Sequence, residues 1–273
     1  MAWQATLRLD YSRQGPRTVA RFAHEGPLRI LQSLYPEGDA VCHNVLVHPP
    51  GGLVGGDTLS VSVTAVEGSH GLLTTPGASR FYRSEGAPAV QDVRVRLEGG
   101  ARLEWLPLEA LYYSGCVAEN RLHLSLEPGA ELLGWDIAAL GLPQAGQPFA
   151  RGSVLQHLEL EGAWLERGRI RADDTRLLDG PLGLAGQRCL ATLFFAAGSD
   201  IPRARREALL ESARALLEPH PLAGATAPGP RVVVVRVLAP LVEPAVQLLK
   251  AVRRAWRPLL WQVDSADPRG WTI

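Results

Sequence analysis

The sequence predicts a mainly β chain whose strands stack in a solenoid-like arrangement and whose C-terminal part adds two helices. Three observations predict this fold class. Short segments with period-two alternation fill most of residues 1–198, a strand–turn–strand unit of about 30 residues recurs, and helical spacing of apolar residues appears only within residues 199–273. We therefore expect a single domain over residues 1–273, with the helix-containing part packed on a β body.

Five segments of the β body alternate apolar and polar residues as half-buried strands do. Within residues 60–64, for example, small polar residues face one way and valines the other. The 28 glycines and 21 prolines punctuate such segments with turns. The predicted strands are residues 6–11, 57–66, 90–97, 121–126 and 154–160.

A glutamate followed by glycine or proline opens each copy of the recurring unit. The four copies begin at Glu67, Glu98, Glu127 and Glu161, at spacings of 31, 29 and 34 residues. Each copy continues with a small residue and a strand, which is typical of stacked coils or hairpins. The alternative is that the chain reuses one turn chemistry without a structural repeat.

The C-terminal third has a different pattern. Apolar residues recur at helical spacing after Pro202, which predicts a helix that Pro219 ends. A loop rich in glycine, proline and alanine is predicted at residues 221–230, and the β-branched run at 231–239 predicts a buried strand. A second helix is predicted over residues 241–256, with Pro244 in its first turn, where proline is tolerated.

Charge and composition exclude several classes of function. The 28 basic residues balance 28 acidic ones, which argues against nucleic acid or a membrane surface as the main partner. Lys250 is the only lysine, so most Schiff-base and P-loop chemistry is excluded. The N-terminal alternation is unlike a signal peptide, and the three cysteines form no CxxC motif. We therefore expect a cytoplasmic protein without a disulfide framework, a structural zinc site or a membrane segment.

Several motifs lack the context that their chemistry needs. Residues 51–57 (GGLVGGD) lack GK[ST] and precede a strand, so we expect a tight turn there rather than a phosphate site. The seven histidines show no HxxxH or HExxH spacing, and no GxSxG elbow surrounds Ser79. Cys42 and His43 come nearest to a metal pair, but adjacent strand residues point to opposite faces.

Acidic residues in the strands after the repeated turns are the strongest candidates for chemistry. These strands carry Glu104, Asp136 and Glu166, while Ser79 and Glu109 lie near the far ends of their units. In a stacked-coil fold such positions form a row, and buried acids in a row need water or a cation nearby. The alternative is that these acids occupy the solvent face.

Four long motifs, in this order, resemble the urease accessory protein family UreD, also called UreH. They are HPPGGLVGGD (48–57), TTPGASRFYRS (74–84), LEWLPLEALYYSG (103–115) and LLGWDIAALGLP (132–143). WLERGRI (164–170) and PRGWTI (268–273) are similar to later segments of the family, so the resemblance extends from Trp3 to Trp271. It implies a two-layered β-superhelix with a pair of C-terminal helices, in agreement with the periodicity.

The resemblance implies a non-catalytic scaffold rather than an enzyme. Members of this family bind the urease apoprotein on one side and the accessory protein UreF on the other, and UreF recruits the GTPase UreG, which delivers nickel. The family is also associated with an internal channel through which nickel passes during urease maturation. We therefore expect no tightly bound cofactor and no stable metal site, only Ni²⁺ in transit.

Motif positions of the family can be transferred to individual residues of this chain. Two departures are Leu142, where the family commonly has arginine, and Leu108, where it commonly has glutamine. The channel and nickel-transit candidates are Asp57, Ser79, Asp136 and Glu166. The secondary candidates are Glu104, Glu109, Cys42 and His43.

Weak binding suits an ion in transit. Single carboxylates along a hydrated tunnel attract Ni²⁺, whereas thiolate pairs or imidazole clusters would trap it. Trp256, Trp261 and Trp271 are candidates for the UreF-facing surface, the alternative being that they pack the helices on the sheet. An exposed apolar partner surface also predicts poor solubility without UreF.

Two other functions stay open at this level. One is a β-helical carbohydrate-active enzyme in which Glu104 pairs with Glu109 or Asp136 as acid and base. The other is a purely structural adaptor that carries no ion.

Overall fold

Two large β-sheets lie face to face in the computed structural model of this protein, which describes residues 2–264 and 266–271. One sheet, here called the outer sheet, has seven strands in the order β15-β14-β11-β8-β5-β1-β2. Its strands are β1 (Gln4–Gln14), β2 (Arg17–Glu25), β5 (Thr58–Ala65), β8 (Ala89–Leu97), β11 (Cys116–Leu126), β14 (Gly152–Leu160) and β15 (Trp164–Arg171).

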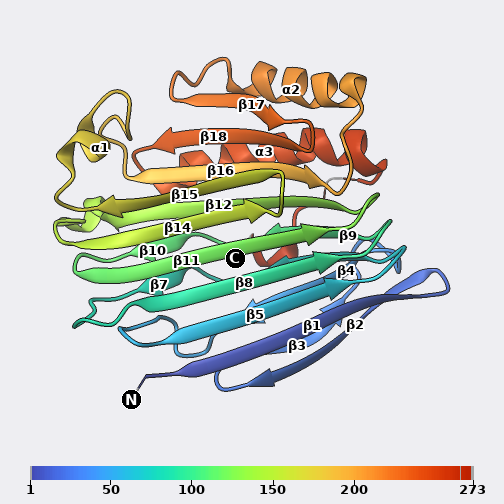
Figure 1. The fold of residues 1–273 in the computed structure, drawn as a ribbon, viewed down its shortest axis with the longest axis horizontal. Coiled ribbons are helices and arrows are strands. Elements are labelled where there is room, and N and C mark those ends of the chain that lie inside the picture. The colour runs from blue at the N-terminus through green and yellow to red at the C-terminus, as the bar shows by residue number, and fades with distance from the viewer. Residues whose placement is uncertain (1, 265, 272–273) are drawn as a thin grey trace.

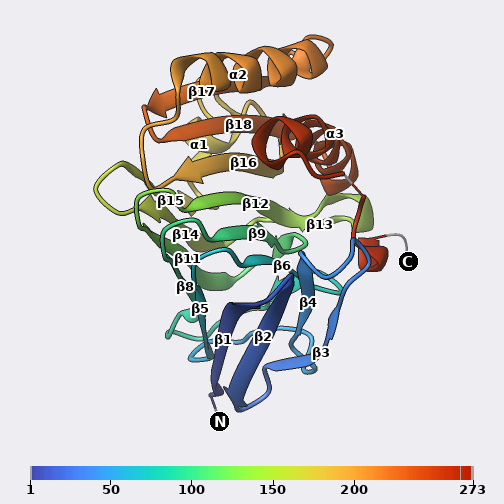
Figure 2. The same cartoon turned by 90° about the vertical axis from the view of Figure 1, so that its right-hand side faces the viewer.

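The second sheet, here called the inner sheet, lies between the outer sheet and the helices (Figure 2). Its main path has the order β17-β18-β16-β12-β9-β6-β4-β3, with β7, β10 and β13 attached beside it. Its strands are β3 (Arg29–Leu34), β4 (Cys42–Val47), β6 (His70–Thr74), β7 (Ser79–Phe81), β9 (Arg102–Leu106), β10 (Ala110–Tyr112), β12 (Glu131–Leu142), β13 (Gln147–Pro148), β16 (Cys189–Ala197), β17 (Ala223–Gly229) and β18 (Val232–Ala239).

The solenoid-like repeat is confirmed for three of its four copies. The turns at Glu67, Glu98 and Glu127 each carry the chain from the outer sheet to the inner one, and successive coils pair in parallel. The turn at Glu161 instead makes an antiparallel hairpin of β14 and β15 within the outer sheet. Trp164, just past that turn, packs against Phe194 of the inner sheet, so the hairpin closes the end of the stack.

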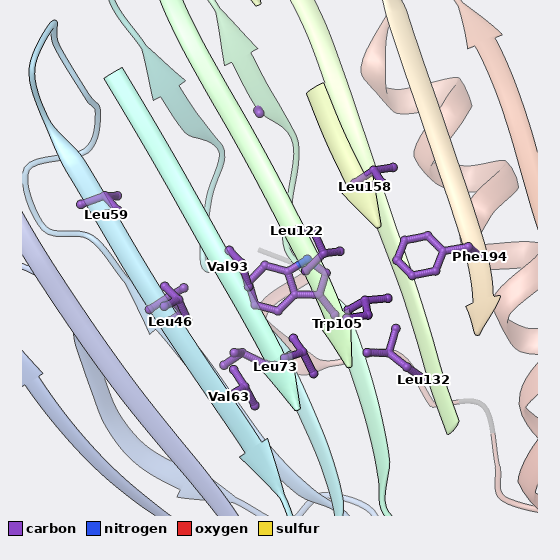
Figure 3. Packing of buried hydrophobic residues seen from close by; sticks show 14 of the residues in the cluster. Leu46, Leu59, Val63, Leu73, Val93, Trp105, Leu122, Leu132, Leu158 and Phe194 are labelled. Carbon is purple, nitrogen blue, oxygen red and sulfur yellow. The ribbon is translucent and has the colours of Figure 1, made fainter. Parts of the chain in front are cut away.

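Apolar side chains from both sheets fill the space between them. Figure 3 shows Leu59, Val93 and Leu122 of the outer sheet facing Trp105 and Leu132 of the inner sheet. The period-two pattern of the strands produces this layer, because alternate side chains of each strand point to the same face. Truncating one such leucine to alanine typically costs about 2–5 kcal/mol of stability.

A second apolar layer lies between the inner sheet and the helices. Phe195 and Val235 of the sheet pack with Leu209 and Trp256 of the helices. These helices are α2 (Arg203–Leu217) and α3 (Val242–Trp261). The short helix α1 (Thr175–Asp179) instead contributes Leu178 to the layer between the sheets, and two short 3-10 turns are η1 (Pro143–Ala145) and η2 (Arg269–Trp271). The two predicted C-terminal helices therefore pack on the β body, as expected.

Two details of the C-terminal prediction and one of the β body need correction. The helix α3 continues past residue 256 and includes Pro258 before Gln262 ends it in a left-handed conformation. The segment predicted as a loop contains the edge strand β17, which pairs with β18 through an irregular register after Thr226. Proline and glycine are compatible with an edge strand because one side of its backbone needs no partner strand. The short helix α1 was not predicted.

No helix within the described part of the chain is long and apolar enough to cross a membrane.

Candidate functional site

A polar track interrupts the apolar layer between the two sheets. On the outer sheet Gln91, Asn120 and Gln156 are register partners on neighbouring strands. On the inner sheet Asp136, Thr192 and Arg236 are likewise aligned across neighbouring strands. Burying polar groups between apolar sheets costs stability unless they find hydrogen-bond partners. This track is therefore the candidate functional site.

Asp136, in β12, is the central acid of the track. Its Oδ1 accepts a hydrogen bond from Asn120 Nδ2 at 2.7 Å, and its Oδ2 accepts one from Gln156 Nε2. The residue is 8% exposed. Burial raises the pKa of Asp136 to about 6, against the opposing effect of the two amide donors. Within the described part of the chain Asp136 forms no ion pair, although the charge of Arg236 also opposes the rise in its pKa.

Three hollows follow the track. The first, of about 230 Å³, is lined by His48, Ser79 and Gln91 among others. The second, of only about 20 Å³, also touches Ser79 and Gln91 and reaches Asp136. Such a volume holds about one or two water molecules. The track thus narrows at Asp136.

The third hollow opens on the other side of Asp136. It has a volume of about 580 Å³ and is lined by Gln156, Glu166, Thr192 and Arg236 among others. The hydrogen bond between Gln156 and Asp136 stands between this hollow and the narrow one. Glu166, on β15, forms an ion pair with Arg236, and each side chain is about one-third exposed.

Three of the four residues selected from the sequence, Ser79, Asp136 and Glu166, line the hollows along this track. Asp57 has a different place. Its Oδ1 accepts from the backbone N–H of Trp3 at 2.7 Å and its Oδ2 from that of Val54 at 2.8 Å. Asp57 therefore holds the glycine-rich turn to the first strand and lines none of the three hollows.

Glu104 does not lie in a row with Asp136, and this part of the sequence prediction is wrong. Glu104 pairs in register with Leu133, so it lies an odd number of residues from the position of Asp136. An odd offset puts two strand residues on opposite faces. Glu104 therefore faces α3, so the pairing of Glu104 with Asp136 considered for a carbohydrate-active enzyme does not form.

Glu104 instead lies in a buried ion cluster. Its oxygens accept hydrogen bonds from Arg253 Nε at 2.9 Å and Arg257 Nε at 3.1 Å, and His70 Nε2 lies 3.4 Å from Oε1. Burial alone would raise the pKa of Glu104, but Arg253, His70 and Arg257 hold it far below its usual range. Arg257 also binds Glu37, which contacts His43 at 2.6 Å.

The other secondary candidates lie away from the track. Cys42 faces the apolar layer between the sheets, while His43 faces the ion cluster, so the two point to opposite faces as expected. Glu109 is half-buried, and its backbone carbonyl accepts from Ser79 N at 2.9 Å. All three cysteines are free and buried. Burial raises the pKa of both Cys116 and Cys189 to about 12, so neither thiol is a ready metal ligand.

The three tryptophans selected for a partner surface pack α3 and the C-terminal segment onto the sheet. Trp256 is fully buried, and its indole N–H donates to the carbonyl of Leu209. Trp261 is also buried and donates to Glu131. Trp271, half-buried, packs in a tilted arrangement against Trp135, with 4.9 Å between ring centroids. This arrangement corresponds to the alternative stated from the sequence.

Sequence reasoning missed the outer-sheet half of the track. Gln91 and Asn120 each lie seven residues before the glutamate of their turn, and Gln156 lies five before Glu161. Each is a polar residue at an otherwise apolar inward position, which is the signal that could have identified it. His48, at the first hollow, was also missed; burial lowers its pKa despite nearby Asp57.

The chain was compared with known protein families and with curated proteins. The family model described as UreD urease accessory protein matches residues 4–272. A urease accessory protein UreD of Variovorax paradoxus (strain S110) is 65% identical over 274 residues, 99% of each chain. Proteins with the same description from Paracidovorax citrulli (strain AAC00-1) and Methylibium petroleiphilum (strain ATCC BAA-1232 / LMG 22953 / PM1) are 64% and 51% identical over 99–100% of each chain.

Proposed function

We propose, from the premise that this chain belongs to the UreD family of urease accessory proteins, that it conducts Ni²⁺ along the polar track between its sheets to the urease apoprotein. In this proposal the chain is a metallochaperone scaffold and not an enzyme. The apoprotein and UreF bind at different places on it, UreG is recruited through UreF, and the complex acts in the cytoplasm. Nickel is cargo, and no cofactor is tightly bound.

Asp136 is the observation that carries the proposal. A carboxylate buried without a cation is costly, and here two neutral amides give it only partial compensation. The narrow hollow reaches Asp136 on one side, and the wide hollow reaches its hydrogen-bond partner Gln156 on the other. A divalent cation that reaches Asp136 is therefore attracted by a carboxylate charge that the two amides do not neutralise.

The other groups on the track suit passage rather than storage. They include a hydroxyl at Ser79, neutral amides, and a second acid at Glu166 in the wide hollow. Such single oxygen ligands hold Ni²⁺ more weakly than a cluster of thiolates or imidazoles. An ion that crosses from the narrow to the wide hollow must also replace the hydrogen bond between Gln156 and Asp136.

Reconstituted urease maturation tests this proposal. Asp136→Ala and Glu166→Ala are expected to lower the nickel content and activity of urease severalfold while the complex with UreF and the apoprotein still assembles. Glu161→Ala is the matched control, because Glu161 is an exposed acid in a turn at the end of the same hairpin. Normal assembly with full nickel loading by both variants would overturn the channel and favour a structural adaptor.

A further inference from the structure

Two histidines and a glutamate meet on the solvent face of the outer sheet, on the opposite side from the polar track. His157 and Glu159 are two residues apart on β14, so their side chains share a face. His123, on the neighbouring strand β11, is the register partner of Glu159. Figure 1 shows β11 and β14 side by side in this sheet. Rigid paired strands therefore hold the three side chains together.

The three side chains turn their ligand atoms toward one point. His157 Nε2 lies 2.8 Å and His123 Nδ1 lies 3.2 Å from the same oxygen, Glu159 Oε2. One ligand atom from each residue lies within 4.8 Å of those of the other two. Metal–nitrogen and metal–oxygen bonds of about 2.0–2.2 Å require ligand atoms roughly 3–3.5 Å apart, so small side-chain rotations within the cluster are needed to hold one ion.

A fourth residue, Asp92 of β8, is placed to support His123. Its Oδ1 is buried, has no hydrogen-bond partner among residues 2–264 and 266–271, and lies 3.5 Å from His123 Nε2. A histidine that binds metal through one ring nitrogen usually donates the other N–H to a carboxylate, which fixes the tautomer. Asp92 Oδ1 can accept the Nε2–H of His123 in this way. Such a role accounts for a buried oxygen that otherwise has no hydrogen bond to the described residues.

The charges around the cluster are close to balanced. Arg94 donates to Asp92 Oδ2 at 2.9 Å, and Arg121 pairs with Glu119, which also lies 3.8 Å from Arg169. Arg167, the register partner of His157 on β15, is exposed to solvent. The arginines moderate the affinity for a cation and leave the three ligand atoms accessible.

We propose that His123 Nδ1, His157 Nε2 and Glu159 bind one divalent first-row transition-metal ion on the outer face of the sheet, with Asp92 as the acceptor that orients His123. Imidazole and carboxylate together suit Ni²⁺, Cu²⁺ or Zn²⁺ better than Mg²⁺ or Ca²⁺. Water completes the coordination, and binding displaces any proton shared between the imidazoles and Glu159. The site is independent of the track, because the outer sheet separates the two.

Calorimetric titration of the full-length, untagged chain with NiCl₂, and separately with ZnCl₂, tests the site. The Asp136→Ala variant is expected to keep one binding event of unchanged affinity, whereas the double variant His123→Ala/His157→Ala loses it, with at least a hundredfold weaker binding. Asp92→Asn is expected to weaken binding about tenfold, the loss typical of an outer-shell partner. His24→Ala removes one exposed histidine from strand β2 of the same sheet and is expected to have no effect.

A spectroscopic measurement separates a built site from histidines that merely neutralise Glu159. With one equivalent of CuCl₂, electron paramagnetic resonance is expected to show coupling to two nitrogens in the wild type and to one in His157→Ala. Equal affinity and stoichiometry in the wild type and the double variant would overturn the site. Loss of the event in Asp136→Ala, with retention in the double variant, would also overturn it and assign the ion to the track instead.

Discussion

The two faces of β9 and β12 bury acids in opposite ways. On the helix side, Glu104 is fully buried between Arg253 and Arg257, and its pKa is far below the ordinary value. On the side facing the outer sheet, Asp136 accepts hydrogen bonds from two neutral amides, and burial raises its pKa to about 6. The charge of Glu104 is neutralised by the two arginines. The charge of Asp136 is not neutralised in this way, and Asp136 lines the narrow hollow.

This difference distinguishes a buried acid that stabilises the fold from a buried acid that costs stability. The ion cluster around Glu104 ties α3 to β6 and β9, so its charges stabilise the packing of the C-terminal part. Asp136 forms no ion pair with any other described residue and costs stability while it is ionised. Residues that cost stability at neutral pH and line a cavity are typical of functional sites.

The largest expected effect comes from Glu104→Gln. Removing one partner of a buried ion pair leaves uncompensated charge and costs about 3–5 kcal/mol. The pKa of Glu104 is lowered in the fold, so its contribution is complete above the unfolded pKa of about 4.3 and is lost as pH falls through the folded value. Urea unfolding at pH 7.5 measures the loss.

Two further variants sharpen this test. Glu207→Gln breaks an exposed i,i+4 pair with Arg203 on α2 and is expected to leave the unfolding midpoint unchanged. Replacing Glu104, Arg253 and Arg257 together by leucine and methionines is expected to recover part of the stability lost in Glu104→Gln. If Glu104→Gln unfolds at the wild-type urea concentration, the cluster is not what holds α3 to the sheet.

The contrast between Glu104 and Asp136 also shows which features could be predicted from the sequence and which could not. Period-two alternation and the recurring turns predicted the strands and three coils, because those patterns follow from burying one face of each strand. They could not show that the turn at Glu161 makes a hairpin, since the same glutamate–glycine turn serves both connections. Asp136 and Glu104 looked equivalent because aligning the units by their turns ignored the parity of the positions. Arg253 and Arg257, the partners of Glu104, lie about 150 residues away in the chain.

The next largest expected effect is a gain in stability instead of a loss. Asp136→Asn is expected to stabilise the protein by about 1–3 kcal/mol at pH 7.5, because the variant removes the cost of an ionised buried carboxylate. The pKa of Asp136 is raised from its ordinary 3.8 to about 6, so the wild type loses stability as pH rises through this window. The difference between variant and wild type should therefore shrink toward zero near pH 4.

Thermal unfolding from pH 4 to pH 7.5 measures this pH dependence, and urease activation assayed in parallel is expected to fall. Asparagine keeps the size of the side chain, and rotation of the Gln156 amide can present its oxygen to the new N–H. An Asp136→Asn variant that is less stable than the wild type at pH 7.5 would show that the ionised carboxylate is part of the structural framework, as Glu104 is.

The smallest effect concerns Glu166 and Arg236, which form the ion pair on the Asp136 side of the inner sheet. A double-mutant cycle with Glu166→Gln and Arg236→Gln is expected to give a coupling energy below about 1 kcal/mol, since both side chains are partly solvated. The coupling should weaken further at 0.5 M salt. A coupling above about 2 kcal/mol would place this pair with the structural cluster of Glu104.

A weak ion pair allows Glu166 to exchange Arg236 for an arriving cation without unfolding the edge of the sheet. A buried pair such as Glu104–Arg253 cannot make this exchange.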